Sequence, residues 1–105
     1  MPINNNLANR GLATLLTTIT TTTAGTSATV SDMSIYKWIF IEFISSGLVV
    51  DSRTVPFDVF NDGVTIQLNT YYTSYAYGNI YWFDNTHVKG NVTPTGSSIK
   101  VYGIK

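Results

Sequence analysis

The segment YKWIFIEF, residues 36–43, decides the fold, because nowhere else do aromatic and β-branched residues run so long without a turn-forming residue. These residue types favour strands, and we predict that the segment is the central strand of a small all-β domain. Successive side chains of a strand point to opposite faces. One face carries Lys37, Ile39, Ile41 and Phe43, and the other carries Trp38, Phe40, Glu42 and Ile44. Both faces are largely apolar, so both need cover from a second sheet, a loop or a second copy of the chain.

Turn-forming residues divide the rest of the chain into further strands. Residues 45–47 (SSG) predict a tight turn, so residues 48–54 are expected to return as the antiparallel partner of the central strand. Residues 64–69 alternate, which predicts that Val64, Ile66 and Leu68 point inward. Residues 12–23 are expected to form one long strand, or two strands broken near Thr17, and residues 27–36 a short strand that ends in a loop. Further strands are expected in residues 79–86 and 98–104, with links at 55–63 and 71–78 and a loop at 87–97 that has turn-forming residues at Gly90 and at 94–96.

This spacing of strands, with no helical periodicity, is typical of an antiparallel β-sandwich, and we expect a jelly-roll-like order of strands. Residues 1–10 are rich in Asn and are expected to form a flexible N-terminal leader, whereas residues 11–105 form a single sandwich domain. Phe57 and Phe60 are expected to close one end of the core. Its main residues are predicted to be Ile39, Ile41, Val64, Ile66, Leu68, Ile80, Trp82, Ile99 and Val101.

The composition excludes several classes of function. Charged residues are 11% of the 105 residues, against about 25% in a typical domain. Six basic residues balance six acidic ones without clustering, so we expect no binding to nucleic acid and no attraction to anionic membranes. No apolar run approaches the roughly 18 residues that predict a membrane span, and the first residues lack the pattern of a signal peptide. A small β domain without cysteine often gains stability by oligomerisation.

Few residues could carry chemistry. With one histidine and no cysteine the sequence predicts no metal site and no cofactor. His87 follows Asp84 by three residues, but nothing else marks a catalytic triad, and we interpret it as a solvated loop residue. Glu42 and Asp84 could form a pair of carboxylates for glycoside hydrolysis, although Glu42 is more simply a polar residue at the end of the sheet or an ion-pair partner of Lys37 or Arg53. We therefore predict no catalytic residues and no enzymatic activity.

The most distinctive residues are the tyrosines of the segment before and within the strand at 79–86. They combine a flat apolar ring with a polar tip, which suits both sugar stacking and protein contacts. The simpler interpretation is that they cap the core and line a subunit interface, and the alternative is direct stacking against a ligand. The candidate ligand-binding residues are Tyr71, Tyr72, Tyr75, Tyr77 and Tyr81.

Three segments resemble one known family. Residues 34–41 carry a Ser, a Tyr-Lys pair and an alternating Ile strand; residues 52–56 read SRTVP; and residues 99–104 read IKVYGI. In this order they resemble the C-terminal β domain of bacteriophage tail-fibre and head-fibre structural proteins. The resemblance covers roughly residues 27–105, and in this sequence only the Asn-rich and Thr-rich segments stand before them.

The resemblance implies a structural protein of the virion, made in the host cytoplasm without a signal peptide. It further implies a homotrimer that contacts other virion proteins and recognises the host surface, often its glycans. The trimer would use the second apolar face of the central strand, and the Thr-rich residues 12–23 are a plausible meeting place of subunits. The alternative is a stand-alone carbohydrate-binding module of lectin type, which would be a monomer or dimer.

Overall fold

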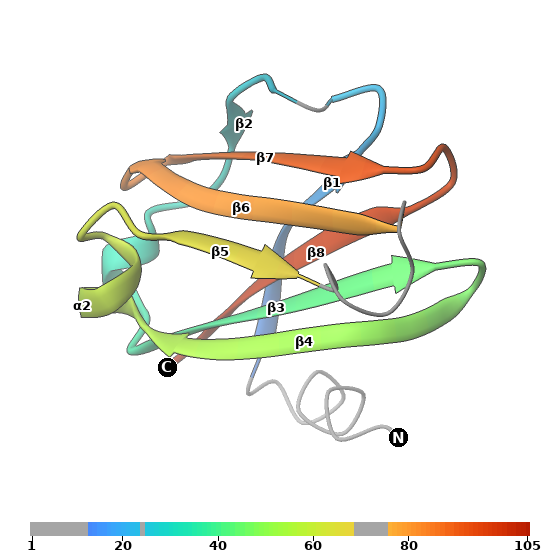
Figure 1. The fold of residues 1–105 in the computed structure, drawn as a ribbon. Helices are drawn as coiled ribbons and strands as arrows, with labels where there is room; N and C mark the ends of the chain where they lie inside the picture. Colours follow the sequence, from blue (N-terminus) through green and yellow to red (C-terminus); the bar gives the residue numbers. More distant parts are fainter. Residues whose placement is uncertain (1–12, 24, 69–75) are drawn as a thin grey trace.

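A computed structural model of the chain describes residues 13–23, 25–68 and 76–105. They form two antiparallel four-stranded sheets packed on each other (Figure 1). Sheet A has the order β1–β8–β3–β4, and sheet B has the order β2–β7–β6–β5. The elements are β1 Ala13–Thr20, β2 Ala28–Thr29, η1 Met33–Ile35, β3 Trp38–Ser45, β4 Leu48–Pro56, α2 Phe57–Phe60, β5 Thr65–Leu68, β6 Tyr77–Asp84, β7 His87–Thr93 and β8 Ser98–Ile104. The all-β antiparallel sandwich predicted from the sequence is confirmed.

The jelly-roll detail of that prediction is not confirmed. In a jelly roll most successive strands cross from one sheet to the other. Here β3 and β4 form a hairpin within sheet A, and β5, β6 and β7 follow one another within sheet B. The sandwich therefore combines crossing connections with hairpins that each stay in one sheet.

Strand β3 is the central strand expected from residues 36–43, although it begins two residues later. Ile39, Ile41 and Phe43 are fully buried between the sheets. The predicted hairpin with β4 is confirmed, and Ser46 and Gly47 turn the chain with φ angles of 54° and 75°. Positive φ at both central residues matches the right-handed twist of the flanking strands, which is why this turn closes a two-residue hairpin.

The core agrees with the predicted one except at its edges. Val64 is 41% exposed, and the prediction was wrong there, because β5 begins only at Thr65 and Val64 lies between the turn at 61–63 and the strand. Trp82 is partly buried against the core. Phe60 is fully buried and Phe57 nearly so, as expected of residues that close an end of the sandwich. Large buried side chains that the prediction omitted are Phe43, Met33, Ile19 and Val88.

Residues 87–97 were predicted to be a loop, and this prediction was wrong for the first seven of them. They form β7, which pairs with β6 and β2. Gly90 had suggested a turn, but a Cβ at this position would lie 2.5 Å from the backbone oxygen of Asn79 and 3.0 Å from Cδ1 of Ile80. A glycine inside a strand can mark a close approach of another chain segment, and here that is its role.

The three segments that carry the family resemblance lie side by side in sheet A. β3 pairs with β4 on one side and with β8 on the other. A Cβ on Gly103 would lie 2.5 Å from two atoms of the Tyr36 ring, so this ring packs directly on the glycine backbone. Tyr36 of the first segment and Gly103 of the third segment therefore pack directly against each other.

The Thr-rich segment forms β1 as one strand with a bulge between Leu15 and Thr17, near the predicted break. The predicted leader, residues 1–10, lies outside the described residues. In the described part of the chain, no helix has the length and apolar character needed to cross a membrane.

Candidate functional site

The outer face of sheet B carries the candidate site. Alternation along β5, β6 and β7 buries every second residue against sheet A and turns the others outward. Tyr77 is 44% exposed, Phe83 is 49% exposed and Tyr81 is half-buried. The outward residues, which we call the outer face of sheet B, are Thr65, Gln67, Tyr77, Asn79, Tyr81, Phe83, His87, Lys89, Asn91 and Thr93.

The strand register brings three carboxamides into one row. Asn79 pairs with Gln67 of β5 and with Asn91 of β7. Residues directly opposite each other in a sheet have Cβ atoms about 5 Å apart, so the three side chains are neighbours. Within the described residues none of the three side-chain amides makes a hydrogen bond. We call Gln67, Asn79 and Asn91 the carboxamide row.

Aromatic side chains lie on both sides of the carboxamide row. Tyr81 is in register with Thr65 and Lys89, and Tyr77 is in register with Thr93. Along β6 the outward residues therefore alternate as Tyr77, Asn79, Tyr81. Two rings separated by a polar amide make a surface that can stack on a ligand and also hydrogen-bond to it.

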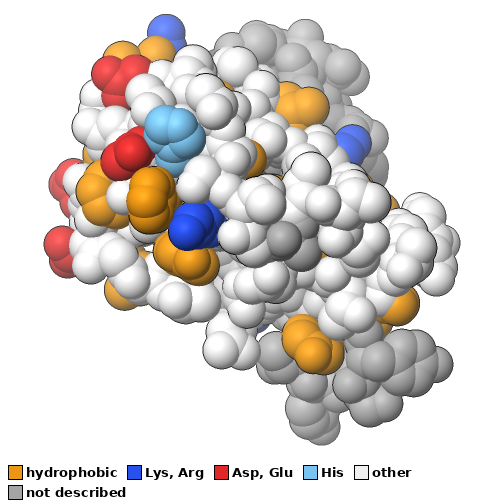
Figure 2. Space-filling view, turned by 90° about the horizontal axis from the view of Figure 1, so that it is seen from above, with side chains coloured by type: hydrophobic (Ala, Val, Ile, Leu, Met, Phe, Trp, Pro, Cys, Tyr) orange, Lys and Arg blue, Asp and Glu red, His pale blue; other side chains and the backbone are white. Residues whose placement is uncertain are grey.

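At one end of this face a basic side chain covers an aromatic ring. The Lys89 Nζ lies 4.7 Å from the centroid of Phe83, close enough for a cation–π interaction. His87 meets the same ring edge-on, with centroids 6.3 Å apart. Figure 2 shows a basic side chain between hydrophobic side chains, with the histidine close by.

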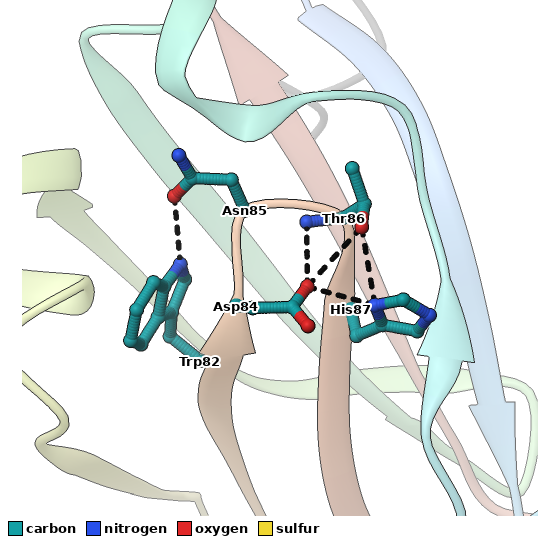
Figure 3. A network of polar contacts seen from close by, with 5 residues as sticks. All are labelled: Trp82, Asp84, Asn85, Thr86 and His87. Carbon is teal, nitrogen blue, oxygen red and sulfur yellow. Dashed lines mark hydrogen bonds and ion pairs between the residues drawn. The ribbon is translucent and has the colours of Figure 1, made fainter.

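A network of polar contacts closes the β6–β7 turn (Figure 3). The Asp84 Oδ1 accepts a hydrogen bond from the Thr86 backbone N–H at 2.9 Å and lies 2.7 Å from the His87 Nδ1. The Thr86 hydroxyl lies 3.2 Å from the same oxygen and 3.1 Å from the Nδ1. On the other side of the turn, Trp82 Nε1 donates to the Asn85 side chain at 3.2 Å. These bonds follow the pattern by which Asp closes a turn through nearby backbone groups.

The hydrogen bond from His87, followed by that from the Thr86 backbone, lowers the pKa of Asp84 below its ordinary value. Asp84 therefore stays ionised to a lower pH than an ordinary aspartate. A catalytic histidine uses one nitrogen for an acid and the other for a nucleophile. Here the Thr86 hydroxyl approaches Nδ1, the nitrogen that Asp84 already binds, so the contacts describe a closed turn rather than a triad.

The other acidic candidate lies elsewhere in the molecule. Glu42 is 3% exposed and points to the outer face of sheet A, where it accepts a hydrogen bond from the Tyr102 hydroxyl at 3.4 Å. Burial, followed by the nearby Glu42 charge, raises the pKa of Tyr102. Glu42 and Asp84 thus belong to different sheets and form no pair of carboxylates. Arg53, expected as a possible partner of Glu42, instead forms an ion pair with Asp51.

The structure brings together two of the five predicted tyrosines. Tyr77 and Tyr81 share the outer face of sheet B, whereas Tyr71, Tyr72 and Tyr75 lie outside the described residues. The carboxamide row was not predicted from the sequence. The sequence did contain a strand signal, because Lys89, Asn91 and Thr93 alternate with small or branched residues. It was not recognised because residues 87–97 were predicted to be a loop.

Comparisons with protein-family models, with curated proteins and with solved structures found no match to this chain.

Proposed function

We propose that the chain is an appendage domain of a bacteriophage virion that recognises glycans of the host surface through the outer face of sheet B. The observation that carries the glycan part is the alternation of aromatic rings and carboxamides on the outer face of sheet B. The pyranose ring has apolar C–H faces that stack on aromatic rings, and its hydroxyls both donate and accept hydrogen bonds. A carboxamide supplies two donors and an acceptor for such hydroxyls.

The virion part of the proposal rests on the resemblance of residues 34–41, 52–56 and 99–104 to fibre domains. It includes a homotrimer held together by the outer face of sheet A, with contacts to other virion proteins. Two cross-strand rows give this face an apolar patch, in which Leu15 is 50% and Trp38 is 43% exposed. The patch consists of the exposed Leu15 and Trp38 with the half-buried Phe40 and Ile104, whereas Ala13 and Tyr102 in the same rows are buried. Large apolar patches mark interaction surfaces on small domains.

Glycan-array binding of the purified chain tests the proposed function. We expect binding that Tyr81→Ala weakens at least about tenfold, which corresponds to ~1.4 kcal/mol. Tyr81→Phe keeps the stacking ring and is expected to retain most of the affinity. Thermal melts of both variants check that the fold is kept. Glycan binding that is equally strong in Tyr81→Ala, or no binding to any glycan, would contradict the proposal.

A stand-alone carbohydrate-binding module of lectin type is the second candidate, because the outer face of sheet B serves it equally well. The two candidates differ in assembly. Sedimentation at micromolar concentration is expected to give close to three times the chain mass of 11.6 kDa. Trp38→Ser should shift this mass toward the monomer, since it places a polar group in the apolar patch of sheet A. A monomeric wild-type chain would exclude the trimer and favour the lectin module.

A further inference from the structure

We propose that the outer face of sheet B binds a single neutral polysaccharide chain that lies along β6, with sugar rings on Tyr77 and Tyr81 and with the carboxamide row holding the sugar between them. This inference rests on the proposed function and adds the class of glycan and its direction on the sheet. It follows from the register of three strands rather than from any single residue.

The spacing of the two tyrosines sets the length of the ligand. Tyr77 and Tyr81 are four residues apart on one strand, and at about 3.3 Å per residue this places them about 13 Å apart. That distance exceeds one pyranose ring and matches a short chain of linked rings. A monosaccharide can therefore occupy one tyrosine at a time, whereas an extended oligosaccharide reaches both.

The carboxamide row fixes the direction of the ligand. Asn79 stands midway between the two tyrosines, and Gln67 and Asn91 extend the row across the strands on either side. A chain that runs along β6 crosses this row once, and its central sugar then meets donors and acceptors on both of its edges. The described residues offer these amides no competing hydrogen bond, so binding a hydroxyl does not first require breaking a bond within the protein.

The charges of this face favour a neutral ligand. The carboxamides are uncharged, and among the described residues of β5, β6 and β7 that face outward between Tyr77 and Tyr81, Lys89 is the only charged side chain. Its ammonium group lies over Phe83, beyond Tyr81 and away from the carboxamide row. The guanidinium of Arg53, which reaches the Gln67 backbone oxygen at 3.5 Å from β4, is neutralised by its ion pair with Asp51. Recognition of acidic sugars commonly uses a guanidinium or ammonium group aimed at the carboxylate, and Asp84 at the same end of the face would oppose a negative ligand.

Calorimetric titration with defined oligosaccharides tests this inference. The neutral probes are cello-, xylo-, manno- and malto-oligosaccharides of one to six units, and the charged probes are oligogalacturonates of the same lengths. In at least one neutral series we expect affinity to rise steeply up to three or four units and then to level off. Oligogalacturonates of equal length are expected to bind at least about tenfold more weakly.

Three variants test whether the side chains of the carboxamide row contribute to the binding affinity, or whether any Asn or Gln substitution lowers it. Asn79→Ala and the exposed Gln67→Ala are each expected to reduce the affinity for the preferred tetrasaccharide about fivefold to tenfold, while affinity for the monosaccharide changes little. The matched control is Asn61→Ala, at the end of α2 and outside this face, which should bind like the wild type. Gln67 lies on a sheet edge and is exposed, so its replacement tests the row even if Asn79→Ala fails to fold.

The outcomes distinguish this inference from the proposed function. Binding that depends on Tyr81 but not on chain length, or that is unchanged in both carboxamide variants, overturns the inference and leaves the proposed function standing. A preference for the charged probes does the same. If neither these probes nor any glycan on an array binds, the proposed function fails and the inference falls with it.

Discussion

Replacing Phe43 by Ala is expected to lower the free energy of unfolding by about 3 to 5 kcal/mol. Phe43 is a fully buried member of the core, where it packs between the two sheets on the inner side of β3. Removing its ring leaves a cavity that close-packed neighbours fill only partly. Since a domain of this size is stable by about 5 to 15 kcal/mol in total, a large part of its stability would be lost.

The matched control is Phe83→Ala on the outer face of sheet B. Phe83 is 49% exposed, and its loss removes a contact with Lys89 rather than opening a cavity. We expect a change of less than about 1 kcal/mol there. Urea unfolding followed by Trp fluorescence measures both variants. Similar losses from the two substitutions would contradict the full burial of Phe43 in the core.

Gly90→Ala is expected to destabilise the fold by about 3 kcal/mol, at the upper end of the usual cost of overpacking. The added methyl group would lie 2.5 Å from the backbone oxygen of Asn79 and 3.2 Å from Cδ1 of Ile19. A backbone oxygen within a paired strand cannot move aside without disturbing the ladder between β6 and β7. The clash can be relieved only by separating strands or sheets.

Whether Gly90→Ala stabilises or destabilises the protein tests the close packing at this position. Where the native backbone accepts a side chain without strain, Gly→Ala stabilises a protein by about 0.4 to 1 kcal/mol through the unfolded state. Asn91→Ala, on the exposed face one residue further along β7, serves as the control and should change stability by less than about 0.5 kcal/mol. A thermal melt of Gly90→Ala at or above the wild-type midpoint would contradict the close packing at this position.

Part of the candidate site could be predicted from the local pattern of the sequence. The period of two along β6 sends Tyr77 and Tyr81 to the same face whatever the rest of the fold does. The carboxamide row could not be found in this way, because Gln67, Asn79 and Asn91 come from three strands and meet only through the register of sheet B. Register is set by pairing between distant segments, which a local pattern does not contain.

The sequence by itself determined the strand class, the hairpin of β3 and β4 and most of the core, because alternation and turn residues act over a few neighbouring positions. It also determined that Ile39, Ile41 and Phe43 share a face. Only the tertiary structure decided the role of glycines such as Gly90, which resemble turn residues locally but serve the close approach of a neighbouring strand. The same holds for Val64, whose outward position depends on where the pairing of β5 begins. The close packing around Gly90 and the exposure of Val64 both depend on how strands that are distant in the sequence pair and pack. A local sequence pattern does not contain this information.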